Sequence, residues 1–172
     1  FLAHNPGIAL IAMGAVVLVS LGVVFGLGIF PFDGRVIIPL AGMMIGNSMS
    51  ATVVTARRVV DELQDKRDDV EARLALGQPW RTAARPHLRA ALRTAMIPQI
   101  ESTKSVGLVI LPGAMTGLIL AGVDPADAVL VQLAIMYLIL GSVATSVVVM
   151  GTGVARRLFT ADHRLVRLPR PT

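Results

Sequence analysis

The residues that could perform acid–base, metal or phosphate chemistry are few in this sequence and lie far apart. The three histidines, His4, His87 and His163, are isolated, and none belongs to a paired motif of the kind that binds zinc. Neither Lys66 nor Lys104 follows a glycine, so the chain has no glycine-rich phosphate loop for ATP. The lack of cysteine excludes disulfides, thiolate metal sites and cysteine nucleophiles. We therefore expect a non-catalytic chain that binds no cofactor of its own.

Two groups of charged residues remain to be interpreted. Asp68, Asp69 and Glu71 form a carboxylate cluster, but they fall in a stretch patterned as a solvated helix and are expected to be surface charge. Glu101 and Lys104 are three residues apart, a spacing that lets side chains meet on a helix. We expect them to form an ion pair at a membrane interface. The alternative is that they line an entrance on the same side.

The composition is that of a membrane protein. Apolar residues make up 54% of the 172 residues, mean hydropathy is +0.71, and the 16% of charged residues are clustered. About 20 apolar residues suffice for a helix to cross the hydrocarbon core of a bilayer. Four segments of roughly this length are predicted to span the membrane as helices: residues 7–30, 36–56, 105–123 and 128–155. The expected fold class is all-α, a polytopic membrane protein with a helical cytoplasmic segment.

The charge distribution predicts the orientation. Ten Lys or Arg fall in residues 57–104 and five in residues 156–172, which places fifteen of the sixteen on one side of the membrane if the spans alternate. The positive-inside rule makes that side cytoplasmic. The predicted organisation is two spans in residues 1–56, a cytoplasmic helical segment in 57–104, two spans in 105–155 and a basic cytoplasmic tail in 156–172. The charge of +5 needs no nucleic-acid partner.

Several residues inside the spans are candidates to line a cavity or a water-filled pathway across the membrane. The second span carries Asn47, Ser48 and Met49, polar or polarisable groups that are costly against lipid. Gln132 in the last span is a further candidate, and Pro112-Gly113 should kink or break the third span. Methionine can bind soft metals but is more often packing, so any metal site is left open. Gly-x-x-x-Gly pairs, such as Gly42 with Gly46, suit close helix packing.

The cytoplasmic segment is predicted to contain three helices. The first runs from Arg57, carries an apolar stripe of Val60, Leu63, Val70 and Leu74, and ends at Gly77. A short helix starts at Pro79 and presents Trp80 and Arg81, residue types enriched in binding surfaces. We expect Pro86 to break this helix. An amphipathic interfacial helix should follow and end at Pro98.

The sequence resembles a known family over most of its length. "EARLALG" looks like the Glu-Ala-Ala-x-x-x-Gly loop of ABC transporter permeases. More specifically, "PLAGMMIGNSM", "LALGQPWRTA", "RAALRTAMIPQIESTKSVGLVILPGAMTGLILAGVDPADAV" and "QLAIMYLILGS" resemble the FetB-like, or YbbM-like, permeases. This group is associated with bacterial iron export and with aluminium tolerance in plants.

The resemblance implies a permease subunit in the plasma (inner) membrane, exporting iron or a metal-linked solute and working with a separate cytoplasmic ATPase as a homodimer of each. It also implies N-terminal truncation, with three further spans ahead of residue 1. The implied ATPase-coupling residues are Glu71, Gly77, Pro79, Trp80, Arg81 and Arg85. The translocation-path candidates are Asn47, Ser48, Met49, Glu101, Lys104, Pro112, Gly113 and Gln132.

The sequence is also compatible with two other functions. A membrane scaffold or regulator could use the same segment to recruit a cytoplasmic partner, although it would need neither a broken helix nor a polar span. An ion-driven secondary transporter would be expected to carry ionisable residues within its spans, and the span cores here have none.

Overall fold

The computed structural model describes residues 14, 22, 34–105, 113–160 and 164–166, and these are almost entirely helical. The helices are α2 (Gly34–Asp65), α3 (Arg67–Ala75), α4 (Trp80–Ser105), α5 (Gly113–Leu120) and α6 (Pro125–Leu158). Within these ranges the one extended pairing is an isolated antiparallel bridge between Phe159 and Leu165. The prediction of an all-α chain is confirmed.

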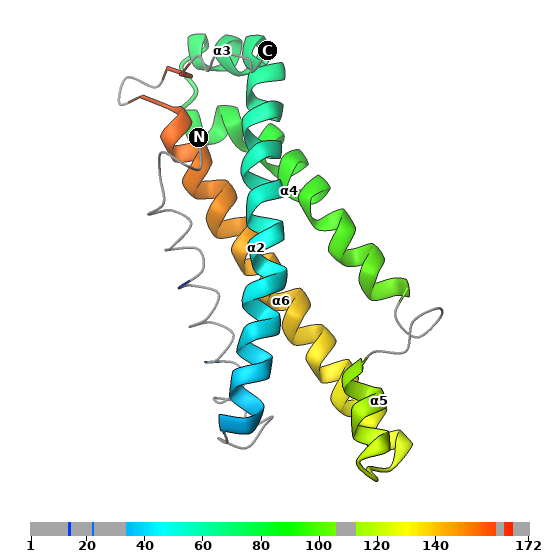
Figure 1. Ribbon diagram of the computed structural model, residues 1–172. Helices are drawn as coiled ribbons and strands as arrows, with labels where there is room; N and C mark the ends of the chain where they lie inside the picture. The colour runs from blue at the N-terminus through cyan, green and yellow to red at the C-terminus, as the bar shows by residue number, and fades with distance from the viewer. Residues whose placement is uncertain (1–13, 15–21, 23–33, 106–112, 161–163, 167–172) are drawn as a thin grey trace, which may run out of the picture.

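The three long helices pack against one another. Helices α2 and α6 cross along much of their length, α4 descends beside them, and α3 lies across the end of α2 (Figure 1). Helix α5 packs on α6 at the opposite end of the molecule (Figure 1). We call the end formed by α3, the start of α4 and the end of α6 the basic end.

One described helix, α6, is long and apolar enough to cross a membrane. The predicted second span, residues 36–56, forms the first two-thirds of α2. The predicted first span, apart from Gly14 and Gly22, and residues 106–112 of the third lie outside the described ranges. The number of four spans therefore stays a prediction.

The short turn between α5 and α6 follows from its sequence. Gly122 has φ +88°, the left-handed conformation that glycine adopts readily, and ends α5. Asp124 then caps α6, its side chain accepting a hydrogen bond from the Ala126 N–H at 2.8 Å, and Pro125 occupies the first turn. The apolar run of α6 ends at Arg156 and Arg157.

The predicted breaks at Pro86 and Pro98 are wrong, because α4 continues through both prolines to Ser105. Proline removes one backbone hydrogen bond and crowds the preceding turn. Here burial of one face outweighs that cost: Ala83, Ala84, Ala91 and Ala95 are buried, and α4 packs on both α2 and α6. Tertiary packing therefore holds together a helix that local sequence signals would divide in three.

The first cytoplasmic helix is also different from its prediction, since α2 ends at Asp65 and α3 begins at Arg67. No glycine or proline marks the change of direction at Lys66, whose N–H still donates to the Glu62 carbonyl at 3.0 Å. The turn brings Leu63 at the end of α2 and Val70 on α3 into the same core, and both are fully buried. Packing, rather than a sequence signal, therefore sets the turn.

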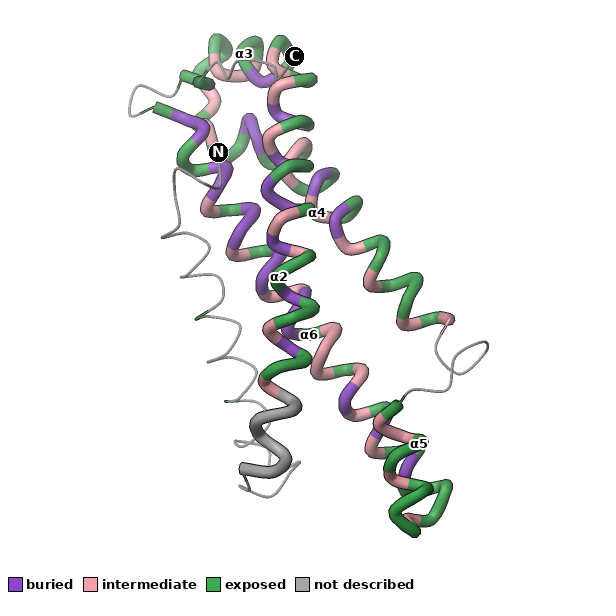
Figure 2. The backbone as a smooth tube through the Cα atoms, in the orientation of Figure 1, coloured by how far each residue is buried: buried purple, intermediate pink, exposed green. Residues whose placement is uncertain are grey.

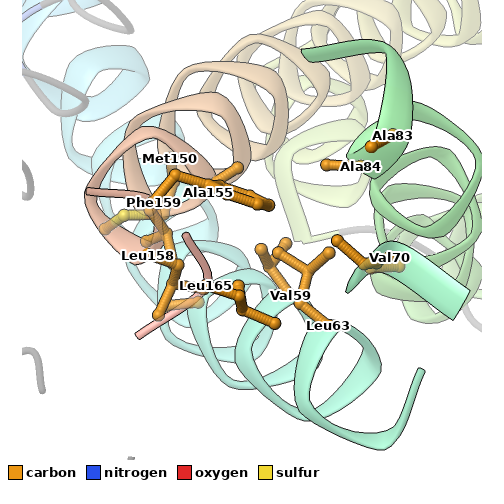
Figure 3. Close-up of a cluster of buried hydrophobic side chains, with 13 residues drawn as sticks. Val59, Leu63, Val70, Ala83, Ala84, Met150, Ala155, Leu158, Phe159 and Leu165 are labelled. Carbon is orange, nitrogen blue, oxygen red and sulfur yellow. The ribbon is translucent and has the colours of Figure 1, made fainter. Parts of the chain in front are cut away.

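The larger of two described hydrophobic clusters lies at the basic end and joins four helices and the C-terminal segment (Figure 3). It comprises Ala56, Val59, Leu63, Val70, Ala83, Ala84, Ala91, Met150, Val154, Ala155, Leu158, Phe159 and Leu165. The predicted stripe of Val60, Leu63, Val70 and Leu74 packs in or against this cluster, which confirms it. The basic end is consequently a packed unit and not a set of loose loops.

The Leu92 side chain of α4 packs against α6 at Gly151, a buried glycine that the sequence analysis did not single out. A Cβ atom added there would clash with the Leu92 side chain and touch Thr55 of α2 at 3.5 Å. Glycine at this position therefore lets three helices meet.

Enlarging Gly151 should destabilise the protein. Gly151→Leu is expected to lower the free energy of unfolding by about 1–3 kcal/mol, because overpacking forces Leu92 and Thr55 apart. The measurement is denaturant unfolding in detergent micelles. Gly141→Leu on the same helix is the matched control, since a Cβ at Gly141 meets nothing within 4 Å. Equal losses in both variants would contradict the close-packing interpretation.

Candidate functional site

The turn between α3 and α4 projects one apolar side chain from the basic end. Gly77 has φ +80° and donates its N–H to the Leu74 carbonyl at 2.9 Å, while the Gln78 N–H reaches the Arg73 carbonyl at 3.2 Å. This pair of bonds is a Schellman motif, which ends a helix in a fixed geometry. It leaves Leu76 81% exposed. The predicted stop at Gly77 is confirmed, and the turn (residues 76–79) presents a rigid apolar tip.

Leu76 was missed by the sequence analysis. It lies two residues after Leu74 and therefore outside the apolar stripe. An apolar residue outside the stripe is the signal that could have identified it. In Figure 2 the turn lies at the same end as α3 and far from α5. Pro79 is the last residue of the turn. Its carbonyl accepts the first N–H bonds of α4, from Thr82 at 2.9 Å and Ala83 at 3.1 Å.

Trp80 faces inward rather than outward. Its ring stacks on Phe159 with centroids 5.2 Å apart and an interplanar angle of 28°, and it packs against the large cluster. Arg81 is exposed, with its guanidinium carbon 5.5 Å from the centroid of the Trp80 ring. The two residues line a cavity of about 290 Å³ together with Ala84, Leu88, Thr152, Ala155 and Arg156. Trp80 therefore fixes the start of α4 on the end of α6.

Polar contacts tie α3 to α4. His87 Nε2 lies 2.8 Å from an Asp69 carboxylate oxygen, and Arg73 Nε donates to the other Asp69 oxygen at 3.2 Å. A Glu62 oxygen lies 4.0 Å from His87 Nδ1. The Arg73 hydrogen bond, followed by that of His87, outweighs partial desolvation and lowers the pKa of Asp69 below 3.8. The carboxylate cluster is thus partly structural, and Glu71 itself pairs with Arg67 on α3.

The Asp69 tie should make the packing of α3 on α4 sensitive to acid. A carboxyl whose pKa is depressed by folding stabilises the fold above its ordinary value of 3.8, and this contribution is lost as pH falls through the depressed pKa. Asp69→Asn should speed hydrogen exchange in α3 at pH 7, and the difference from wild type should vanish once pH falls well below 3.8. Asp68→Asn, which removes the same charge from an exposed neighbour on α3, is the matched control. A difference independent of pH would contradict this role.

The C-terminal segment closes over the junction of α2 and α3. Gln64 donates its side-chain N–H to the Val166 carbonyl at 2.9 Å, and Arg67 donates to the Leu165 carbonyl at 3.1 Å. Leu165 itself is buried in the large cluster. The part of the predicted basic tail that the structure describes thus helps to hold the basic end together.

The path candidates of α2 fall on two faces. Asn47 and Met49 are exposed, and Asn47 Nδ2 donates to the Met43 carbonyl of its own helix at 2.8 Å. This N–H group of Asn47 therefore has a hydrogen-bond partner within its own helix. Ser48 is 1% exposed, and its hydroxyl has no hydrogen-bond partner within the described residues. An unpaired buried hydroxyl is costly, so Ser48 is the path candidate on α2 that most needs a partner.

The remaining path candidates are dispersed. Gln132 is buried in α6, and its Oε1 also has no partner within the described part of the chain. Glu101 and Lys104 form the predicted ion pair at 3.1 Å, with both side chains well exposed. Gly113 begins α5, whereas Pro112 lies outside the described ranges. The structure does not gather these residues into one site.

No cluster of three or more His, Cys, Asp or Glu residues that could hold a metal ion occurs in the described ranges. The path candidates Ser48, Asn47, Gln132 and Met49 offer a hydroxyl, two amides and a thioether. Any metal contact would have to use these or residues elsewhere.

Comparison with known proteins identifies the family of this chain. The model of the "Uncharacterised protein family (UPF0014)" matches residues 2–159. The chain belongs to the UPF0014 family. No solved structure matches it.

Curated UPF0014 relatives come from plants and bacteria. The chain is 40% identical over 139 residues to the rice "UPF0014 membrane protein STAR2", covering 81% of this chain and 49% of the relative. It is 37% identical over 154 residues to Bacillus subtilis "UPF0014 membrane protein YjkA", covering 90% and 62%. It is 32% identical over 148 residues to the Escherichia coli "Probable iron export permease protein FetB", covering 86% and 57%.

These matches confirm the resemblance to FetB-like permeases and place the chain in a membrane-protein family. The chain spans between about half and three-fifths of the length of these three relatives.

Proposed function

We propose that the chain is the permease subunit of an ABC transporter that exports iron or a metal-linked solute, driven by a separate cytoplasmic ATPase. The observation that carries the proposal is the α3–α4 turn: an exposed leucine on a glycine-terminated tip whose flanks are locked into the core. The similarity to the Escherichia coli "Probable iron export permease protein FetB" supports the transport class.

A rigid tip can transmit movement because its two flanks connect to different helices. Helix α3 packs on α4 through Asp69–His87 and Val70, while Trp80 fixes the start of α4 to the end of α6 through Phe159. A displacement of the turn must therefore move the ends of α2 and α6 together, since packed interiors move as units rather than deform continuously. We propose that ATP hydrolysis in the partner drives this displacement.

In this proposal the sequence-derived coupling residues have different tasks. Gly77 and Pro79 shape the turn, Arg81 and Arg85 are exposed on the first turns of α4, and Trp80 and Glu71 position the helices. Leu76 is added as the apolar anchor. The side of the membrane on which the basic end lies, and a homodimer of permeases, are further parts of the proposal.

The decisive experiment joins the complete protein with its candidate ATPase in lipid vesicles. Replacing residues 78–85 by a flexible linker should abolish both copurification of the ATPase and permease-stimulated ATP hydrolysis. Retention of both would contradict the coupling role and favour a scaffold function. Iron transport and the effect of iron on ATP hydrolysis are then measured in the intact complex. ATP hydrolysis that does not change with iron would exclude iron as the substrate. It would not contradict the assignment as a permease.

A further inference from the structure

Four arginines from two helices line one groove beside the coupling turn. Arg73 comes from α3, and Arg85, Arg89 and Arg93 come from α4; together with Thr82 they border a cavity of about 590 Å³. The three α4 arginines are four residues apart, so they succeed one another on one helix face at intervals of about 6 Å. The groove is therefore a ladder of guanidinium groups.

The ladder lacks negative charge of its own. Arg73 is partly neutralised by Asp69 at 3.2 Å. The ion pairs found among the described residues include none for Arg85, Arg89 or Arg93, and all three are exposed. Like charges four residues apart disfavour a helix, and a bound anion would remove that repulsion.

The position of the four arginines relative to the bilayer follows from the contacts of α4 with α6. Ala84 and Leu88 of α4 line a cavity with Thr152 and Ala155, and Leu92 lies against Gly151. These are the last turns of α6 before its apolar run ends at Arg156. A spanning helix leaves the hydrocarbon and enters the headgroup layer at such a point. The arginines thus lie at the depth of phospholipid phosphates.

We propose that this groove binds the headgroup phosphate of an anionic phospholipid, with Arg89 and Arg93 as its principal ligands. A guanidinium group offers two parallel N–H donors that match the oxygens of a phosphate. Basic pockets between membrane helices recognise anionic headgroups in this way. The inference is independent of the proposed transport function, because it requires only that α6 spans the membrane.

The test measures lipid retention by the complete protein. Phosphatidylglycerol is titrated against the detergent-solubilised protein and followed by native mass spectrometry, with phosphatidylcholine as the uncharged reference. Arg89→Gln/Arg93→Gln should weaken phosphatidylglycerol retention by at least about tenfold and leave phosphatidylcholine unchanged. Arg57→Gln/Arg58→Gln is the matched control, because it removes the same charge from exposed residues of another helix, in the second half of α2.

The outcomes separate the possible occupants. Equal losses in the two double variants would overturn the proposal in favour of general charge attraction. Unchanged lipid retention, together with loss of ATPase copurification, would assign the groove to an acidic protein surface instead. Should the glutamine variant fail to fold, Arg89→Lys/Arg93→Lys keeps the charge but loses the paired donors. It should still weaken phosphatidylglycerol retention about threefold, and full retention would overturn the proposal.

Discussion

Replacing Leu76 with serine is expected to weaken binding of the ATPase to the complete permease by about 30-fold. Truncating an apolar anchor at the centre of an interface costs roughly 2 kcal/mol or more in binding free energy. Leu76 is 81% exposed at the tip of the turn and contributes little to the fold itself, so the loss should fall on binding alone. The measurement is a binding titration of the ATPase against permease in lipid nanodiscs, with ATP hydrolysis followed in the same samples.

Leu120→Ser provides the matched control for this experiment. Leu120 is 84% exposed and is the last residue of the short helix α5. Helix α5 lies at the end of the molecule opposite to α3 (Figure 2). The Leu120→Ser variant should bind and stimulate the ATPase as the wild-type protein does. Wild-type affinity in Leu76→Ser, or an equal loss in both variants, would remove Leu76 from the coupling site.

Truncating Trp80 should destabilise the basic end. Trp80→Ala removes an aromatic ring stacked on Phe159 and opens space beside the large cluster, so the free energy of unfolding should fall by about 2–4 kcal/mol. Denaturant unfolding in detergent micelles measures this loss. ATPase stimulation should fall as well, because the start of α4 is no longer held on α6.

A double-mutant cycle with Phe159 distinguishes this positioning role from direct docking. If the two rings support each other, Trp80→Ala and Phe159→Ala should show a coupling energy of about 0.5–1.5 kcal/mol in unfolding. Both single variants should also impair ATPase stimulation. If Trp80→Ala alone impairs stimulation and stability is unchanged in either variant, Trp80 contacts the partner directly and the positioning role is wrong.

The sequence alone determined the helical class, the membrane character and the ends of several elements. Gly77 ends a helix as predicted, because glycine adopts the left-handed conformation at least cost. Gly122 and Asp124-Pro125 obey equally local rules, although the predicted spans 105–123 and 128–155 did not place the helix ends there. The stripe of Val60, Leu63, Val70 and Leu74 and the Glu101–Lys104 pair also followed from spacing. These features depend on neighbours a few residues away.

Only the tertiary structure decided the features that depend on packing between distant segments. The chain turns at Lys66 and continues through Pro86 and Pro98, because burial against other helices outweighs local preference. Trp80 faces Phe159, 79 residues further along the chain, and Gly151 admits Leu92, 59 residues before it. Periodicity cannot report such pairings. Trp80, a predicted binding residue, stacks on Phe159. The exposed apolar side chain beside it belongs to Leu76, a residue whose type alone predicts burial.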